Sequence, residues 1–258
     1  MAGQAKQYYD EGDNFANQGR YSEAVASYDK AIAIEPNYFP AWTFRGLALY
    51  NLGRYLEALA SYDKSIAIRP FAGTWDLRAD PLIALGRHAE AIDSFDRSLA
   101  IEPNNATAWD NRGTALIALG RYAEAVASYD KAIAINPNIA NTWSNRGVTL
   151  GKLKRHAEAV ASFDRAITIN PNHADLWFGK GNALDELGKL QDAIKCYDKA
   201  IEINPRYFAA WYNKGNNLTN LGKHQEAIGC FEKFIELTPP KYASQVNAVK
   251  QIITKLRG

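Results

Sequence analysis

The stretch Ala106–Ile139, ATAWDNRGTALIALGRYAEAVASYDKAIAINPNI, predicts two helices joined by a tight turn. Small and apolar residues recur on one face of its first half with the 3.6-residue period of a helix: Ala108, Trp109, Gly113, Leu116 and Leu119. The second half repeats this pattern with Ala125, Val126, Tyr129, Ala132 and Ile133. Gly120 between the halves can adopt a positive φ, and Pro137 cannot continue a helix. The stretch is therefore a helix, a turn, a second helix and a stop.

Near-copies of this stretch fill almost the whole chain. Aligning them divides it into repeats 1 to 7, with residues 5–38, 39–71, 72–105, 106–139, 140–173, 174–207 and 208–241. We number the residues of each repeat as positions 1 to 34. Position 4 is aromatic, position 8 is Gly or Ala, position 20 is Ala, position 24 is aromatic and position 32 is Pro in every repeat. A small residue at position 8 lets two helices approach closely, so these positions indicate packing.

The period, the Trp-x3-Gly and Leu-Gly-x-Tyr spacings, the Glu-Ala pair and the closing Pro resemble the tetratricopeptide repeat (TPR). The resemblance covers residues 5–241. It implies an all-α fold, a right-handed superhelical solenoid of seven helix-turn-helix repeats whose first helices line the concave side. Terminal repeats of a solenoid need a cap. Residues 242–257 place apolar side chains on one face and are predicted to form a C-terminal capping helix; the alternative is a helix donated to a neighbouring molecule.

Composition excludes several classes of protein. The 258 residues include 30 Lys and Arg and 28 Asp and Glu, so the net charge is only +2 and predicts no nucleic-acid or membrane partner. No apolar run approaches the roughly 18 residues of a membrane span. The N-terminus lacks the apolar core of a signal peptide. A cytoplasmic protein is the expectation, whether the sequence is whole or a piece of a longer one.

Repeat 3 departs from the pattern. Its preceding turn, which contains Phe71, is one residue shorter, Ala79 replaces the Gly of position 8, and Pro81 lies inside the first helix. A Pro inside a helix costs about 3 kcal/mol, so this helix is expected to bend or to begin late. The irregularity is either tolerated drift or a break that reshapes the groove. In repeat 5, Lys154 replaces the Gly of the turn and is expected to be slightly strained.

Residues that could carry chemistry follow the repeat instead of clustering. Three histidines occupy position 17 of different repeats: His88, His156 and His224. Cys196 and Cys230 share position 23 of neighbouring repeats, where a helix spacing of about 8–10 Å exceeds the reach of a disulfide. No nucleotide-binding, hydrolase or metalloprotease motif is present. The expectation is a protein that is not an enzyme, with no catalytic residue, no cofactor and no metal site.

Position 7 is basic in six successive repeats: Arg45, Arg78, Arg112, Arg146, Lys180 and Lys214. Position 25 is Asp in six: Asp29, Asp63, Asp96, Asp130, Asp164 and Asp198. A half-buried cation needs a partner. The two rows are therefore predicted to form ion pairs between neighbouring repeats; the alternative is a row that binds phosphates.

Positions 2, 5, 6, 9, 12 and 13 of the first helices remain for the concave face. The candidate peptide-binding residues there are Tyr9, Asp13, Phe44, Tyr50, Asp110, Asn111, Thr114, Asn145, Phe178, Asn182, Tyr212, Asn213 and Asn216. Carboxylates outnumber cations on this face, which also includes Asp76 and Asp80, so it favours basic ligands. The asparagines can each donate to a carbonyl and accept from an N–H, which suits an extended peptide.

Chaperone-binding members of the TPR family hold an acidic peptide terminus with Lys at position 5 and Asn at position 9. Repeat 1 has Tyr9 and Asp13 there, so no such clamp is expected. The sequence predicts a non-enzymatic protein–protein interaction scaffold that binds a neutral to basic peptide or protein segment in its concave groove. Two alternatives stay open. One is a scaffold that self-assembles into a homo-oligomer through its convex face or C-terminal helix, and the other is a solvated face without a partner.

Overall fold

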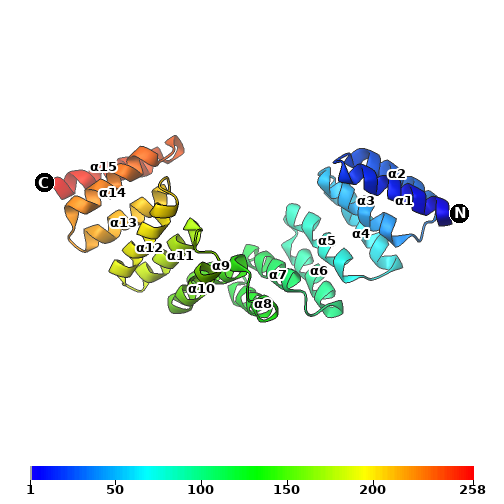
Figure 1. The fold of residues 1–258 in the computed structure, drawn as a ribbon, viewed down its shortest axis with the longest axis horizontal. Helices are drawn as coiled ribbons and strands as arrows, with labels where there is room; N and C mark the ends of the chain where they lie inside the picture. Colours follow the sequence, from blue (N-terminus) through cyan, green and yellow to red (C-terminus); the bar gives the residue numbers. More distant parts are fainter. Residues whose placement is uncertain (1) are drawn as a thin grey trace. The chain divides into compact units, whose positions relative to one another are not determined.

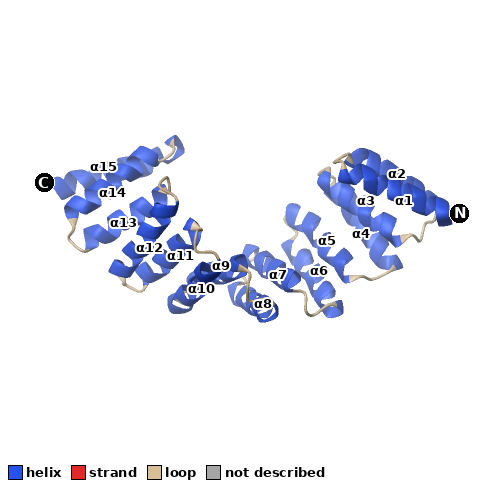
Figure 2. Cartoon of the chain, viewed as in Figure 1, coloured by secondary structure: helices blue, strands red, loops and turns tan. Residues whose placement is uncertain are grey.

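The computed structural model describes residues 2–258, and every regular element in this range is a helix (Figures 1 and 2). In chain order the helices are α1 (Ala2–Asn17), α2 (Tyr21–Ile34), α3 (Phe39–Asn51), α4 (Tyr55–Ile68), α5 (Ala72–Ala84), α6 (His88–Ile101), α7 (Ala106–Ala118), α8 (Tyr122–Ile135), α9 (Ala140–Lys152), α10 (His156–Ile169), α11 (Ala174–Glu186), α12 (Leu190–Ile203), α13 (Phe208–Asn220), α14 (His224–Leu237), the 3₁₀ helix η1 (Pro240–Tyr242) and α15 (Ala243–Arg257). Odd-numbered helices from α1 to α13 are the first helices of the repeats, and even-numbered ones are the second.

Position 15 makes the turn inside each repeat. Six glycines there have φ between 71° and 74°, among them Gly120. The N–H of Gly120 donates to Ile117 O at 2.9 Å and that of Arg121 to Leu116 O at 3.0 Å, which ends the helix in a left-handed cap. Lys154 adopts the same conformation with φ of 59°, and no other non-glycine residue in 2–258 has a positive φ. Lys154 thus makes the turn in a region that favours glycine, which agrees with the strain expected there.

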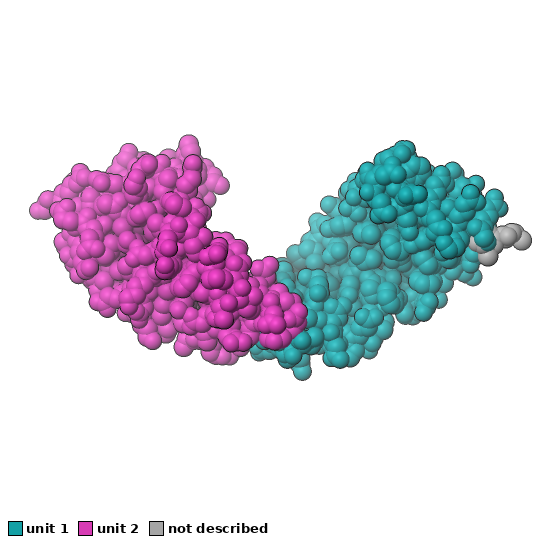
Figure 3. Space-filling view, viewed as in Figure 1, with its two compact units in different colours: residues 1–135 teal, residues 136–258 magenta. Residues whose placement is uncertain are grey.

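The chain divides into two compact units, residues 1–135 and 136–258 (Figure 3). In the first unit, α1 contacts α3 and α3 contacts α5; in the second, α9 contacts α11. First helices of successive repeats therefore lie side by side in each unit, and together they present one face. We call this the first-helix face of that unit.

The ring at position 24 is the centre of each repeat's core. Tyr129 is fully buried, and a Cβ added to Gly113 would lie 2.7 Å from its Cε1, so only Gly fits beside this ring. The same close approach recurs between Gly181 and Tyr197. In repeat 3, Phe95 is instead buried together with Ala79 at position 8. The packing role predicted for positions 8 and 24 is confirmed.

Two details of the predicted packing were wrong. Helix α5 begins at Ala72, position 1 of its repeat like α7 and α9, so it does not start late; the bend stays a prediction. Pro81 is buried inside this helix and has no N–H to donate to the preceding turn. Position 14 was expected to pack, but Leu119 is 43% exposed, and the equivalent leucines of repeats 3 and 6 are similar. This residue caps the helix, where the chain turns away from the core.

Helix α15 covers the end of the second unit. Its Val249 and Ile253 are buried against a cluster that includes Phe231 and Phe234 of α14. At its end, Arg257 Nη2 lies 2.7 Å from Glu232 Oε1, and Glu232 occupies position 25 of repeat 7. The helix thus supplies both apolar surface and a cation to the last repeat, as a capping helix would. The division into seven repeats and a cap stays a prediction.

Candidate functional site

The basic residues of position 7 join neighbouring repeats. In the first unit they lie 2.6–2.7 Å from the position-25 carboxylate of the preceding repeat: Arg45 with Asp29, Arg78 with Asp63 and Arg112 with Asp96. In the second, Lys180 with Asp164 and Lys214 with Asp198 are 2.6 Å apart. The cationic side chains of these pairs are only 17–22% exposed. The predicted ion pairs are confirmed there, so these cations hold the scaffold together.

The partner at position 23 depends on the cation. Arg45 uses its Nη1 to donate to Ser61 Oγ at 2.7 Å, and three further arginines pair with serine in the same way: Arg78 with Ser94, Arg112 with Ser128 and Arg146 with Ser162. Lys180 and Lys214 instead have Cys196 and Cys230 at that position. A guanidinium has a second group that needs an acceptor, whereas an ammonium already paired with a carboxylate can tolerate a thiol. Both cysteines therefore belong to the scaffold.

The two thiols are buried and free, as expected. Burial raises the pKa of the Cys196 thiol to about 11, so it stays protonated at neutral pH. Within the described range of the chain, no group of three metal-ligating side chains comes together. None of the helices in residues 2–258 is long and apolar enough to cross a membrane.

The residues predicted to form the groove all lie on first helices. Most are half-buried, while Thr114 and Phe44 are exposed, Phe44 by 37%. Several aromatic members are already packed. The rings of Tyr9 and Phe44 are 5.7 Å apart, those of Phe178 and Tyr207 4.9 Å, and those of Tyr212 and Phe234 5.2 Å. The predicted groove rings of Tyr9, Phe178 and Tyr212 are therefore each packed against another ring of the same unit.

The hydroxyl of the position-24 tyrosine forms a hydrogen bond with the polar side chain at position 9 of its own repeat. Tyr28 donates to Asp13 Oδ1 at 2.6 Å, and Tyr197 donates to Asn182 Oδ1 at 3.0 Å. The hydroxyls of Tyr129 and Thr114 are 3.2 Å apart. Three of the predicted groove residues are therefore oriented by the core of the protein.

Repeat 3 lacks this internal partner. Position 9 is Asp80 and position 24 is Phe95, which has no hydroxyl. Asp80 is half-buried and makes no hydrogen bond or ion pair within residues 2–258. Burial raises the pKa of Asp80, and the neighbouring Asp76 raises it further. The sequence predicts that Asp80 lies on the first-helix face. Phe95 at position 24 is the sequence feature that indicates that Asp80 lacks the hydrogen bond found in other repeats.

Asp76 lies one helical turn before Asp80 on α5. Its Oδ2 accepts a hydrogen bond from Asn105 Nδ2 at 3.1 Å, but its Oδ1 is buried without a partner. Burial raises the pKa of this carboxyl as well, against the smaller opposing effects of Ser98 and then Asn105. Tyr50 of α3 is near enough that the Asp80 charge contributes to the raised pKa of its hydroxyl. The carboxylates of Asp76 and Asp80, which have few hydrogen-bond partners, thus lie near the hydroxyl of Tyr50 in the first unit.

The predicted row of asparagines is only partly connected. Asn213 Nδ2 donates to Asn182 Oδ1 at 2.8 Å, linking α13 to α11. Asn111, Asn145 and Asn216 are half-buried, and their amides make no hydrogen bond within the described chain. The amide groups of these three side chains are therefore not used within the described chain, whereas the Oδ1 of Asn182 already accepts hydrogen bonds.

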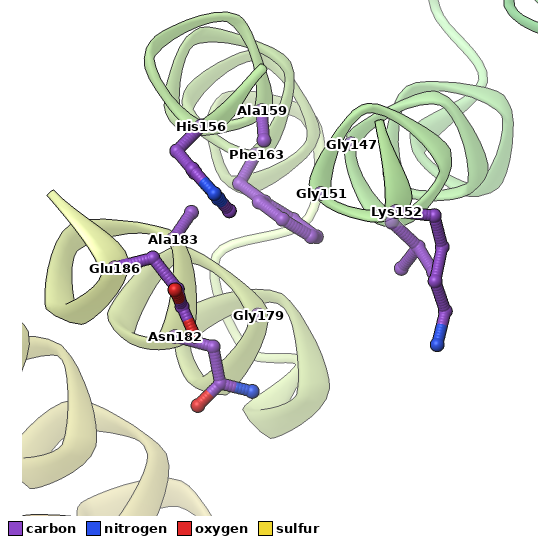
Figure 4. A pocket seen from close by; sticks show the side chains of 11 residues that line it. Gly147, Gly151, Lys152, His156, Ala159, Phe163, Gly179, Asn182, Ala183 and Glu186 are labelled. Atoms are coloured by element: carbon purple, nitrogen blue, oxygen red, sulfur yellow. The ribbon is translucent and has the colours of Figure 1, made fainter. Parts of the chain in front are cut away.

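A pocket opens on the second unit's first-helix face, between α9, α10 and α11 (Figure 4). Its volume is about 260 Å³. It is lined by Gly147, Val148, Gly151, Lys152, His156, Ala159, Phe163, Gly179, Asn182, Ala183 and Glu186. Sequence reasoning assigned Asn182 to the groove but missed the pocket. Its signal was glycine at positions 6 and 12, where repeats 2 to 4 have larger residues such as Phe44 and Tyr50.

Family models match the chain from residue 9 to residue 229. Models described as tetratricopeptide repeat match residues 9–73, 72–105, 94–127, 140–173, 174–207 and 196–229, and one described as TPR repeat matches 113–154. No curated protein matches the chain.

Solved structures are similar at low sequence identity. The C-terminal part of a TPR repeat-containing protein from Cytophaga hutchinsonii has a TM-score of 0.79 at 16% identity, covering 92% of this chain and 98% of that one. MamA residues 41 to the end from Desulfovibrio magneticus RS-1 has 0.62 at 24%, covering 64% and 94%. YrrB, described as a TPR protein with an unusual peptide-binding site, has 0.65 at 23%, covering 72% and 97%. At these identities the likeness concerns the fold alone.

Proposed function

Because the chain belongs to the tetratricopeptide repeat family, we propose that it is a protein-interaction scaffold that binds a neutral to basic peptide or protein segment on its first-helix face. The scaffold residues of positions 4, 7, 8, 24 and 25 are used in packing and ion pairs between repeats. The first-helix positions 5, 6, 9, 12 and 13 differ between repeats and are the ones that can select a partner.

The Asp76–Asp80 pair carries this proposal. Burying a carboxylate without a compensating group costs free energy, which a ligand cation can recover. Asp80 has no internal partner, Asp76 Oδ1 has none, and burial raises the pKa of both. The phenol of Tyr50 lies beside them and offers a ring to a cation. A Lys or Arg side chain supplies the missing charge and hydrogen-bond donors.

Other ligand classes fit this face less well. An acidic peptide terminus would meet the same two carboxylates and be repelled. Phosphates of a nucleic acid would need the position-7 cations, which the scaffold carboxylates already occupy in five pairs. The proposal is therefore a non-enzymatic cytoplasmic scaffold without a nucleic-acid, membrane or cofactor partner.

Binding of a short basic peptide tests the proposal. The probe is a fluorescein-labelled, amidated peptide of alternating Gly with Lys and Arg, and its neutral counterpart has Gln at the basic positions. We expect the basic peptide to bind, and Asp76→Asn with Asp80→Asn to weaken it at least tenfold, about 1.4 kcal/mol. Fluorescence anisotropy at 50 and 200 mM salt measures both affinities, and binding weakens with salt.

The control carries the same change of charge elsewhere. Asp93→Asn with Asp192→Asn alters two exposed carboxylates on the second helices α6 and α12. It should change the affinity by less than twofold. Equal weakening by the two double variants would show that binding follows net charge and would refute the proposed site, as would equal binding of the neutral peptide.

Self-assembly is the alternative, and light scattering tests it. The apolar face of α15 is already buried against α14 of the same chain, so donation of this helix requires it to leave its own last repeat. A mass that stays at one chain from micromolar to high concentration is expected. A mass that doubles with concentration would favour the self-assembling scaffold.

A further inference from the structure

The floor of the second unit's pocket is an aromatic ring held between two glycines. A Cβ added to Gly147 of α9 would lie 3.0 Å from Phe163 Cε2, and one added to Gly179 of α11 would lie 2.6 Å from Phe163 Cε1. Figure 4 shows the Phe163 ring between the two first helices. This placement requires glycine at position 179, whereas a Cβ at position 147 would be tight against the ring. The pocket floor is therefore apolar and rigidly packed.

Gly151 keeps the pocket open and has no packing reason to be glycine. A Cβ added there meets no atom within 4 Å. The same position 12 carries Tyr50, Ile83 and Ile117 in repeats 2 to 4. Glycine inside a helix weakens it relative to residues with a side chain. Repeat 5 therefore lacks, at this side of the pocket, the large side chain that repeats 2 to 4 carry, and in repeat 1 the small Ala16 takes the same position.

The size of the pocket selects one side chain and not a whole ligand. Its volume is about 260 Å³. An apolar cavity of about 150 Å³ accepts benzene, and pockets for drug-sized molecules span roughly 300–1,000 Å³. A Phe, Leu or Met side chain therefore fits within it with its backbone at the mouth.

The mouth of the pocket carries an amide with a fixed orientation. Asn182 Oδ1 accepts hydrogen bonds from Tyr197 Oη at 3.0 Å and from Asn213 Nδ2 at 2.8 Å. Its Nδ2 makes no hydrogen bond within residues 2–258, so both N–H groups remain for a ligand oxygen. Lys152 on α9 and Glu186 on α11 flank the mouth with opposite charges, which match the dipole of a peptide group.

We infer that this pocket binds a large apolar side chain of a peptide whose backbone carbonyl accepts a hydrogen bond from Asn182 Nδ2. The inference rests on the proposed function and gives it a second specificity. Basic residues are selected by Asp76 and Asp80 in the first unit, and an apolar anchor is selected by the second unit. The occupant is a segment of another polypeptide.

An equivalent pocket in the first unit shows what changes the preference. It lies between α1, α2 and α3, has a volume of about 280 Å³ and uses the same repeat positions. There Phe44 replaces Gly179, and Tyr28 with its bound Asp13 replaces Phe163. That pocket presents a carboxylate, whereas the one in the second unit presents only carbon at its floor. The apolar preference therefore belongs to the second unit.

The test uses N-acetyl-L-phenylalaninamide, which presents one apolar side chain with an uncharged amide group on each side of its Cα. Its titration into the ¹⁵N-labelled full chain is followed by NMR. We expect saturable shifts at Val148, Gly151, Gly179 and Ala183, and binding of N-acetylalaninamide about tenfold or more weaker. Gly151→Leu should fill the pocket and abolish these shifts without lowering Tm, because leucine favours the helix.

Two further variants separate the pocket from general effects. Gly229→Leu makes the same change at an exposed site of α14 where an added Cβ also meets nothing; it should leave the shifts intact. Asn182→Asp keeps the acceptor for Tyr197 and Asn213 but removes the N–H donors, and should weaken the probe about tenfold. Unchanged probe binding in Gly151→Leu would overturn the inference, as would self-association of the wild type that this variant abolishes.

The basic peptide provides the independent readout. If that peptide binds through Asp76 and Asp80 and the phenylalanine probe gives no localised shifts, the inference is wrong and the proposed function stands. If the probe occupies the pocket while the basic peptide does not bind, the pocket is a site and the basic preference is wrong.

Discussion

Asp13 and Asp80 occupy the same position of repeats 1 and 3, on the same face of the first unit, yet their surroundings differ. Asp13 accepts a hydrogen bond of 2.6 Å from Tyr28, the ring at position 24 of its own repeat. Asp80 has Phe95 at that position and receives no hydrogen bond from it. The carboxylate at position 9 is therefore hydrogen-bonded by the core in repeat 1, whereas the carboxylate at the same position of repeat 3 is not.

The difference shows that the residue type at a groove position does not tell whether its side chain is already hydrogen-bonded within the protein. A polar residue at position 9 belongs partly to the core wherever position 24 is Tyr, as in repeats 1, 4 and 6. It is open wherever position 24 is Phe. In repeat 3 this change coincides with Ala79 and Pro81, so the irregular repeat is also the one with the unpaired carboxylates.

Removing the hydroxyl from repeat 1 should have the largest effect. Tyr28→Phe removes the 2.6 Å hydrogen bond to the half-buried Asp13, and hydrogen bonds to charged groups contribute about 1.5–3 kcal/mol. We expect the free energy of unfolding to fall by about 1.5–2 kcal/mol in urea denaturation. Tyr129→Phe is the control, since its neutral partner Thr114 should limit the loss to about 1 kcal/mol or less. Equal losses would mean that the Asp13 charge contributes nothing.

Adding the hydroxyl to repeat 3 should act in the opposite direction. Ala79→Gly with Phe95→Tyr restores the combination found in repeat 4 and gives Asp80 an internal donor. We expect affinity for the basic peptide to fall about threefold to tenfold, because the ligand then competes with a hydrogen bond already made. Ala79→Gly alone should leave the affinity unchanged. Tighter binding by the double variant would contradict the role of Phe95.

Lowering the pH should weaken the binding of the basic peptide through Asp76 and Asp80. The folded-state pKa values of Asp76 and Asp80 are raised above the ordinary 3.8, so the folded state retains protons that the unfolded state has released. Stability from these groups therefore falls as pH rises from about 3.8 through the raised values. Binding of the cationic peptide follows the charged form and is lost as pH falls through the same window. Anisotropy between pH 7 and 4 should show this loss, and Asp76→Asn with Asp80→Asn should abolish the pH dependence.

Asp13→Asn should have a small effect on binding. Tyr28 can still donate to the amide oxygen, so the internal hydrogen bond survives the loss of charge. We expect basic-peptide affinity to change by less than twofold, measured beside Asp80→Asn on the same peptide. A loss as large as that of Asp80→Asn would erase the distinction between the two positions.

The side chains at positions 7 and 23 of repeat 6 offer a small change in stability. Lys180→Arg with Cys196→Ser gives positions 7 and 23 of repeat 6 the Arg–Ser combination of repeats 2 to 5. We expect a gain of about 0.5–1 kcal/mol in unfolding free energy, the contribution of one hydrogen bond. Lys180→Arg alone should be less stable than the double variant, because its second donor lacks the serine oxygen. A double-mutant cycle with zero coupling would refute this explanation of the cysteines.

Period and spacing predict most of the fold from sequence. The turn glycines, the Gly113–Tyr129 contact and the ladder of ion pairs follow from positions that recur, because each repeat solves the same packing problem. Position 14 was misjudged, since a helical period assigns Leu119 to a face without showing that the helix ends there. The candidate site was harder to predict because it depends on differences between repeats. Asp80 is unpaired because Phe95 at position 24 has no hydroxyl, and the pocket is open at Gly151 because position 12 has no side chain there. Both effects depend on which helices are neighbours, so they are seen only in the structure.

The most direct measurement compares wild type and Asp80→Asn in two readouts, calorimetric titration with the basic peptide and thermal unfolding. If Asp80 is kept unpaired for a ligand, removing its charge should raise Tm and at the same time weaken the peptide severalfold. These opposite signs are what a binding site retained at the expense of stability predicts. A variant that binds the peptide as tightly as wild type, or that is less stable, would contradict the central claim.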